Sequence, residues 1–225
     1  MLSPSQAAEV QRDDERTLAR GIRQAVVLAV IMMSSLGGYL AVLHWRGHDG
    51  KDRVTHTAWD EFFPFQPGWV WVYLTPYVIG PIVIGALRPS TFRWYVQRGL
   101  VAVFLSLTIF AIWPTQTKPR EYAVVGMDPT SLLYQKMVAI DDPPANAAPS
   151  LHVSLTCLLA FALLRDFPRW WPVITVCVLL VWAATLFTRQ HHLIDVATGV
   201  LLACLVVLVW AGRRPASRCP AEGLS

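Results

Sequence analysis

Charged residues are scarce in this sequence. Asp, Glu, Lys and Arg make up only 15% of the 225 residues, whereas 54% are hydrophobic, and the mean hydropathy is positive. Soluble domains carry about 25% charged residues, so this composition excludes an ordinary soluble globular protein. The apolar residues fall in long runs joined by short polar connections, which is the pattern of an integral membrane protein.

Cysteine is also scarce, and its positions exclude a disulfide in the outer loops. Three of the four cysteines lie inside apolar runs and the fourth lies in the C-terminal tail: Cys157, Cys177, Cys204 and Cys219. The net charge is only +4, and the basic residues flank the apolar runs without interleaved aromatics. Nucleic-acid binding therefore has little support. The sequence shows neither an internal repeat nor a second domain.

Six apolar runs are close to the ~20 residues that a helix needs to cross a bilayer. They lie at about residues 24–43, 69–87, 97–113, 150–165, 170–187 and 193–211. The pattern predicts an all-α fold, an integral membrane six-helix bundle. Acidic residues precede the first run and no small-residue cleavage site follows it, so we expect an anchor and not a signal peptide.

The membrane domain should span residues 24–212. Residues 1–23 are expected to form a cytoplasmic N-terminal segment, and Ser3 to Gln6 resemble the start of an interfacial helix. Residues 213–225 form a tail with two prolines and small polar residues, which predicts disorder.

Arginine placement predicts the orientation of these spans. One side of the membrane collects Arg12, Arg16, Arg20, Arg23, Arg88, Arg93, Arg98, Arg165, Arg169, Arg213, Arg214 and Arg218. The positive-inside rule makes that side cytoplasmic and puts both termini there. The two long loops, at about 44–68 and 114–149, mix basic and acidic residues and should face outward. We therefore expect a protein of the bacterial inner membrane, with these loops on its periplasmic face.

Two short histidine motifs stand where apolar runs begin after polar loops. They are Pro149-Ser150-Leu151-His152 and His191-His192-Leu193-Ile194-Asp195. The fourth and sixth runs cross the membrane in the same direction, so both motifs should lie on the outer face. Helix N-termini present backbone N–H groups and a positive dipole end, which favour a bound anion.

The spacing of these residues suits phosphoryl chemistry. His191 and Asp195 are four residues apart on one helix face, so the carboxylate can fix the tautomer of the imidazole. The other ring nitrogen could then attack phosphorus and form a phosphohistidine. His152 could protonate the leaving oxygen and later activate the acceptor. Ser150 and the backbone at Leu151 could hold phosphate oxygens, and the mechanism needs no metal or cofactor.

At these residues the sequence resembles the type-2 phosphatidic acid phosphatase superfamily, whose two C-terminal motifs match Pro149 to His152 and His191-x3-Asp195, followed by Gly199. The six-span layout is similar too. That superfamily includes lipid phosphate phosphatases, vanadium haloperoxidases and the sphingomyelin and inositol phosphorylceramide synthases. The resemblance implies that His191 is the nucleophile, Asp195 its partner and His152 the acid and base.

The sequence departs from the phosphatase branch at three places. Leu151 replaces the glycine of Pro-Ser-Gly-His, Thr185 stands where the second motif has arginine, and nothing reads Lys-x6-Arg-Pro. These departures resemble the synthase branch, in which Pro-Ser-Leu-His and an arginine-less histidine motif occur. The closest resemblance is thus to the inositol phosphorylceramide and sphingomyelin synthase-like branch.

The missing cations need replacements if a phosphate is bound. Lys118, Arg120 and Arg189 are the candidates on the outer side, and Arg120 is favoured because residues 113–120 resemble a degenerate first motif. His192 points about 100° away from His191 on the helix and is expected to act behind the site, as is Asn146.

Three interpretations remain open from the sequence. The first is an enzyme acting on a membrane lipid phosphate or phosphodiester, with water or a lipid hydroxyl as acceptor. The second is a metal- or haem-binding membrane protein in which His152, His191, His192 and Asp195 are ligands. The third is a transporter or scaffold without chemistry.

Overall fold

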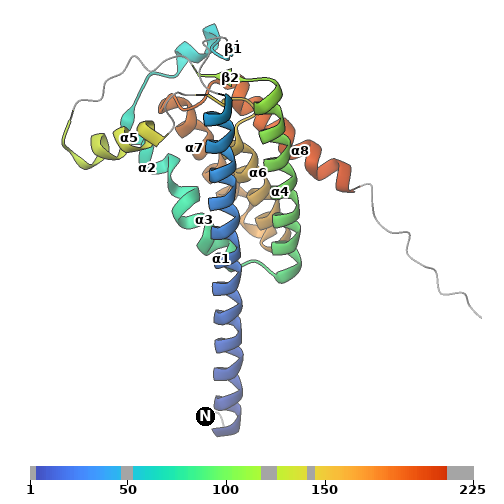
Figure 1. Cartoon of the computed structure of the whole chain (residues 1–225). Coiled ribbons are helices and arrows are strands. Elements are labelled where there is room, and N and C mark those ends of the chain that lie inside the picture. The colour runs from blue at the N-terminus through green and yellow to red at the C-terminus, as the bar shows by residue number, and fades with distance from the viewer. Residues whose placement is uncertain (1–3, 47–52, 118–125, 141–144, 212–225) are drawn as a thin grey trace, which may run out of the picture.

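The computed structural model describes residues 4–46, 53–117, 126–140 and 145–211. This part of the chain is helical except for two short strands, β1 (Arg53–Val54) and β2 (Thr115–Gln116), which pair in parallel (Figure 1). The prediction of an all-α fold is confirmed. The expected disordered tail, 213–225, lies outside the described residues.

The first helix is far longer than a bilayer core. α1 (Pro4–Arg46) has 43 residues and would extend about 65 Å, against about 30 Å of hydrocarbon. Its N-terminal half projects beyond the other helices (Figure 1). The helix is unbroken at residue 23, so the described residues before the first apolar run continue the same helix.

The second apolar run is divided into three pieces. After η2 (Pro67–Trp69) come α2 (Val70–Tyr73) and α3 (Thr75–Gly85). Pro76 lies in the first turn of α3 and Pro81 lies inside it. Because proline lacks an N–H and clashes with the preceding turn, this segment cannot form one straight helix.

α4 (Pro89–Ile112) begins earlier than residue 97, where the sequence placed it. Pro89 occupies the first turn, where its missing N–H costs nothing. The start is fixed by Asp166, whose Oδ2 accepts the N–H of Arg88 at 2.8 Å and whose Oδ1 accepts the Thr91 hydroxyl at 2.7 Å. A carboxylate from another segment therefore caps α4.

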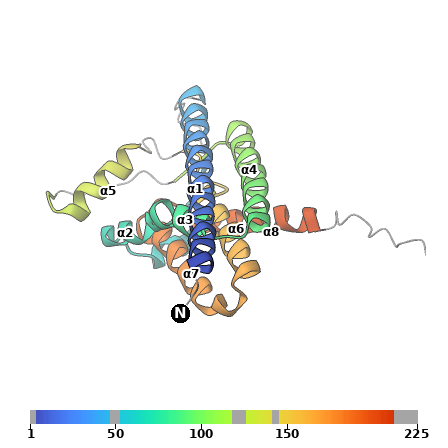
Figure 2. The same cartoon turned by 90° about the horizontal axis from the view of Figure 1, so that it is seen from below.

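Two helical elements occur in regions expected to be loops. η1 (Ala58–Phe62) follows β1, and α5 (Pro129–Ile140) lies to one side of the other helices (Figures 1 and 2). Asp128 begins α5, because its Oδ1 accepts the N–H groups of Thr130 and Ser131 at 3.0 and 3.1 Å. The buried Tyr134 ties α5 to the bundle by donating its hydroxyl to the carbonyl of Thr188 at 3.0 Å.

The last three helices form the centre of the molecule. They are α6 (Leu151–Asp166), α7 (Trp171–Phe187), preceded by η3 (Pro168–Trp170), and α8 (Leu193–Ala211). α6 packs against α4, α7 and α8. The hydrophobic core includes Ala102, Val153, Leu158, Ala162, Leu186, Leu202, Ala203 and Val206.

Four segments are long and apolar enough to cross a bilayer: Glu15–Trp45, Pro67–Gly85, Pro89–Ile112 and Pro168–Phe187. Membrane spanning is thereby supported. α6 and α8 coincide with the fourth and sixth predicted runs, but α6 has only 16 residues, about 24 Å of helix. The six-helix bundle and its orientation remain predictions.

The close crossing of α6 and α8 depends on Gly199. A Cβ at this position would lie 2.7 Å from the carbonyl oxygen of Ser150 and 3.1 Å from the Cβ of Val153. The first distance is shorter than van der Waals contact, and backbone cannot move aside as a flexible side chain can. Any larger residue would therefore push the two helices apart.

We predict that Gly199→Ala destabilises the protein by about 1–3 kcal/mol, the usual cost of overpacking. The measurement is the thermal unfolding midpoint of purified protein in detergent. Gly80→Ala is the matched control, because Gly80 is buried in α3 with nothing within 4 Å of the added Cβ. The control should be at least as stable as wild type, and an unchanged midpoint for Gly199→Ala would contradict the packing argument.

Candidate active site

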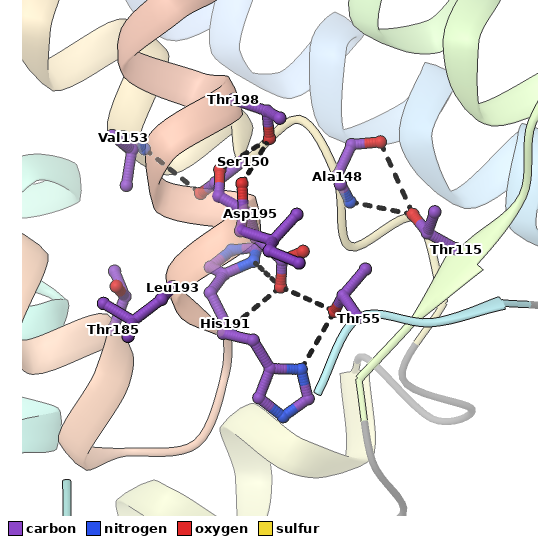
Figure 3. Close-up of polar contacts among 12 residues, drawn as sticks. Thr55, Thr115, Ala148, Ser150, Val153, Thr185, His191, Leu193, Asp195 and Thr198 are labelled. Atoms are coloured by element: carbon purple, nitrogen blue, oxygen red, sulfur yellow. Dashed lines mark hydrogen bonds and ion pairs between the residues drawn. The ribbon is translucent and has the colours of Figure 1, made fainter. Parts of the chain in front are cut away.

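The two histidine motifs meet at one end of the helices. The N–H of Ser150, just before α6, donates to the carbonyl of Asp195 in the first turn of α8 at 3.1 Å. Figure 3 shows Ser150, His191 and Asp195 gathered at this junction. Residues some forty positions apart in the sequence therefore share one site.

Ser150 is the N-cap of α6. Its hydroxyl oxygen accepts the N–H of Val153 at 3.3 Å, and its side chain is fully buried. Capping leaves the hydroxyl proton available to another acceptor. Among the described residues, none accepts a hydrogen bond from the N–H groups of Leu151 and His152. These donors at the start of α6 are therefore available to an anion.

The segment that leads into α6 is buried and held from two sides. Ala148 donates its N–H to Oγ1 of Thr115 at 2.8 Å, and Ala147 donates to the carbonyl of Thr115 at 3.2 Å. On the other side the hydroxyl of Tyr39, from α1, donates to the carbonyl oxygen of Ala145 at 3.0 Å. Asn146 adopts φ 56° and donates to the carbonyl of Tyr39 at 3.4 Å, so it shapes this segment.

His152 is held by two tyrosines of the second apolar run. Its ring stacks on Tyr73, with centroids 4.3 Å apart and planes 5° apart, and its Nδ1 lies 3.1 Å from the hydroxyl of Tyr77. The ring is buried, and its Nε2 has no hydrogen-bond partner. His152 also lies close enough to His191 for their charges to interact. One nitrogen is thus anchored and the other is free.

His191 and Asp195 form a loose pair. Nδ1 of His191 lies 3.7 Å from Oδ2 of Asp195, beyond hydrogen-bond distance, and has no other partner. Oδ1 of Asp195 is likewise buried without a partner. Buried polar atoms are normally satisfied, so two such atoms on adjacent side chains point to a hydrogen bond that closes when the site is occupied.

Thr55, the residue that follows β1, links Asp195 to His192. Oγ1 of Thr55 donates to Oδ2 of Asp195 at 3.2 Å and lies 2.9 Å from Nδ1 of His192 (Figure 3 draws both contacts of Thr55). A hydroxyl has one proton, so when it donates to Asp195 it must accept from His192. This arrangement puts the proton of His192 on Nδ1. The backbone N–H of His192 also donates to Oδ2 of Asp195, at 2.8 Å.

His192 is suited to remain neutral. Burial lowers its pKa below the ordinary 6.5, although the charges of Asp195 and Asp60 act in the opposite direction. The hydrogen bond to Thr55 needs only a proton on Nδ1, which the neutral ring can carry. His192 thus contacts Asp195 through its backbone N–H and through Thr55, and its ring also contacts His56 edge to face at 5.2 Å.

The sequence predicts that the N–H groups at the start of α8 are free to bind an anion, but in the structure carboxylates accept two of them. Oδ1 of Asp60 accepts the N–H of Leu193 at 2.7 Å, and Asp195 accepts that of His192. Two carboxylates therefore occupy this helix end, where negative charge is favoured by the dipole. Among the described residues, the start of α6 leaves the N–H groups of Leu151 and His152 without partners, whereas at the start of α8 these carboxylates accept the N–H groups of His192 and Leu193.

Asp60 is the buried anchor of this cap. Its Oδ2 accepts both the N–H and the hydroxyl of Thr57 at 2.7 Å. Burial acts to raise the pKa of Asp60, but the hydrogen bonds from Leu193 and Thr57 outweigh it and hold the pKa below the ordinary 3.8. The carboxylate is thus charged at neutral pH.

Arg189 occupies a left-handed position at the end of α7, with φ 54°. The N–H groups of Gln190 and His191 both donate to the carbonyl of Thr185, at 3.0 and 3.1 Å, and close the helix. The guanidinium donates through Nη1 to the carbonyl of Asp60 at 3.1 Å, and Nη2 lies 3.8 Å from Glu61. Arg189 is therefore held beside η1.

The other predicted cations cannot be placed. Lys118 and Arg120 lie outside the described residues. Thr115 to Thr117, from the same stretch, pair with β1 and support the segment before α6. Thr185, at the position of the missing arginine, is fully buried and donates to Trp182 at 2.7 Å. Within the described ranges, no group of three His, Cys, Asp or Glu side chains could hold a metal ion.

Sequence reasoning missed Thr55, Asp60, Tyr73 and Tyr77. The tyrosines carried a signal, because they are four residues apart in the second apolar run, a spacing that would put them on one face of a helix. Thr55 and Asp60 carried none, since both reach the site from a long loop through contacts distant in sequence.

We predict that Asp60→Asn lowers the unfolding midpoint at neutral pH by a few degrees, because hydrogen bonds to a charged group contribute about 1.5–3 kcal/mol. Since the folded pKa is lowered, this stabilisation is present at neutral pH and is lost as the pH falls through the folded value, below 3.8. Midpoints measured from neutral pH downward should converge for wild type and variant. Glu15→Gln, at an exposed site, should follow wild type throughout, and a pH-independent gap would refute the assignment.

Comparison with known proteins agrees with this geometry. No curated protein and no solved structure gives a significant match to the chain. A family model described as the PAP2 superfamily matches residues 64–209, a stretch that contains both histidine motifs and the helices α2 to α8 up to Val209. Membership of this family indicates phosphatase chemistry. This membrane-spanning chain belongs to the PAP2 superfamily.

Proposed function

We propose that the protein is a lipid phosphatase or lipid headgroup phosphotransferase that works through a phosphohistidine. The observation that carries the proposal is the set of three unpartnered buried atoms at one junction: Nδ1 of His191, Oδ1 of Asp195 and Nε2 of His152. A purely structural cluster would satisfy its polar atoms, whereas a catalytic one keeps them for substrate and transition state.

In the first half-reaction Nε2 of His191 attacks phosphorus. Nδ1 faces Asp195, so the carboxylate can accept its proton in a hydrogen bond and stabilise the positive charge that develops on the ring. The N–P bond forms while the bond from phosphorus to the leaving oxygen breaks. His152 donates a proton to that oxygen from Nε2.

In the second half-reaction His152 acts as the base. It removes a proton from the acceptor hydroxyl, whose oxygen attacks phosphorus as the P–N bond breaks and His191 is restored. The hydroxyl of Tyr77 suits this alternation, because it can accept from Nδ1 of His152 in both states, so that Nδ1 keeps its proton while Nε2 gives up a proton from the charged ring and takes one back. Water as acceptor gives a phosphatase, and a lipid hydroxyl gives a transferase.

The N–H groups of Leu151 and His152 are the best-supported donors to the phosphate oxygens, with the Ser150 hydroxyl beside them. Arg189 adds a positive charge near His191, and Lys118 and Arg120 are further candidates from the loop after β2. These cations would take the place of the arginine that Thr185 replaces.

The lipid assignment rests on the surroundings of the site. The motifs lie at the ends of apolar helices, a position that favours contact with lipid headgroups, and the arginine distribution favours the outer leaflet of a bacterial inner membrane. Leu151 in place of glycine and the lack of the second-motif arginine favour the synthase-like branch and therefore a lipid acceptor.

The test is product analysis of wild type, His191→Ala and Asp195→Asn protein with a panel of lipid phosphates and phosphodiesters, with and without diacylglycerol or ceramide. Wild type alone should release phosphate or headgroup, or form a new headgroup-bearing lipid when an acceptor is present. Asp195→Asn should keep the fold and lose about 10⁴-fold in turnover, the loss seen when a histidine has the wrong tautomer.

His44→Ala is the matched control, because His44 is exposed on α1 and bonds only its own helix. It should retain full activity. Vanadate, a phosphate-like oxyanion, should inhibit wild type, and rapid quenching should trap an acid-labile phosphoenzyme. Wild-type turnover in His191→Ala would end the phosphohistidine mechanism.

Thr55 is expected to act as a positioning residue through Asp195 and His192. Thr55→Val keeps the shape but removes the hydroxyl, so kcat should fall roughly 10- to 100-fold with little change in KM, as expected for one lost hydrogen bond to a charged group. Thr55→Ser should restore most of the rate. Equal kcat in Thr55→Val and wild type, or loss of activity in Thr55→Ser, would show that the Thr55 hydroxyl does not act through Asp195 and His192.

A further inference from the structure

A second polar site lies on α1 and α4, away from the histidine motifs. A cavity of about 290 Å³ is lined by Arg20, Arg23, Gln24 and Val27 of α1 and by Phe92 and Arg93 of α4. It is close to the start of α4, whereas the histidine motifs meet at the start of α6 and α8. The volume is near the lower end of small-ligand pockets, about 300–1,000 Å³, which fits a headgroup and not a whole lipid.

Three exposed arginines line this cavity: Arg20, Arg23 and Arg93. Among the described residues, none forms an ion pair or hydrogen bond with Arg20, Arg23 or Arg93. Asp166 lies at this end of the helices, but both of its oxygens are used at the start of α4. Guanidinium groups repel one another, so such a cluster is stabilised by an anion between them.

Gln24 provides a second, independent sign of a ligand. Its side chain is 4% exposed, it lines the cavity, and its Oε1 has no hydrogen-bond partner. An unpaired buried amide oxygen costs free energy unless a donor reaches it. A ligand that combines an anion with hydroxyl donors would satisfy both the arginines and Gln24.

The surroundings of the cavity favour a lipid over a soluble anion. Val27 and Phe92 give it an apolar wall. Further along α1, Val26, Val30 and Met33 are exposed at 56%, 61% and 67%, which offers an apolar track next to the cavity on a helix that crosses the membrane. Basic pockets beside membrane helices commonly bind anionic headgroups.

We propose that α1 and α4 form a binding site for the headgroup of an anionic phospholipid. Arg20, Arg23 and Arg93 bind its phosphate, Gln24 binds a headgroup hydroxyl, and the acyl chains lie along the exposed face of α1. Phosphatidylglycerol has the required phosphate and hydroxyl groups. The proposal does not depend on the proposed function, because none of these residues belongs to the histidine site.

The test is native mass spectrometry of the full chain in detergent, titrated separately with phosphatidylglycerol, phosphatidic acid, phosphatidylcholine and inorganic phosphate. Wild type should bind one phosphatidylglycerol in preference to phosphatidylcholine. The variant Arg20→Gln/Arg23→Gln/Arg93→Gln should bind it about tenfold more weakly, and Gln24→Leu should lose the preference for phosphatidylglycerol over phosphatidic acid.

Arg169→Gln is the matched control, since Arg169 is an exposed arginine of η3 that does not line the cavity. It should bind like wild type. Equal weakening by Arg169→Gln would mean nonspecific charge attraction and would overturn the proposal, as would displacement of the lipid by inorganic phosphate. If the triple variant unfolds, the single variants Arg93→Gln and Gln24→Leu serve as the test. Unchanged phosphatidylglycerol binding in both would refute the proposed site.

Discussion

The close approach of α6 and α8 is the constraint on which the site depends. Their first turns are joined by backbone, through the bond from Ser150 to the carbonyl of Asp195, and the crossing leaves no room for a side chain at Gly199. Because the contact is made by main chain, the relative positions of His152 and His191 do not depend on flexible side chains. A mechanism in which one histidine attacks and the other transfers a proton needs this fixed separation.

Carboxylates from neighbouring segments fix where these helices begin. Asp60 caps α8 from η1, and Asp166 caps α4 from the end of α6. The charge of Asp60 is buried and would be costly alone, but it accepts three N–H or O–H donors, and the partly exposed Asp166 accepts two. Each carboxylate lies at the positive end of a helix dipole, so side chains from outside a helix fix where that helix begins.

Local sequence patterns could predict part of this architecture. Apolar run length located the helices, and the four-residue spacing of His191 and Asp195 predicted that they lie close together, although His191 precedes α8 and is not in its first turn. Thr55 and Asp60 could not be predicted, since their roles arise from contacts with residues more than 130 positions away. Pro76 and Pro81 predict a kink in the second run from the sequence alone, because proline lacks an N–H, and the structure divides the run there into α2 and α3.

The length of α1 has a consequence for how the protein responds to its membrane. The helix lines the arginine cavity near Gln24 and, about 22 Å further along, contacts the segment before α6 through Tyr39. The apolar part of α1, Glu15–Trp45, has 31 residues, about 46 Å of helix, and a hydrophobic stretch longer than the hydrocarbon core adjusts to a change in membrane thickness by tilting. Because the Tyr39 hydroxyl is hydrogen-bonded to the carbonyl of Ala145, tilting of α1 would shift the segment that positions Ser150 and His152. The geometry of the candidate active site would therefore depend on the thickness of the surrounding bilayer.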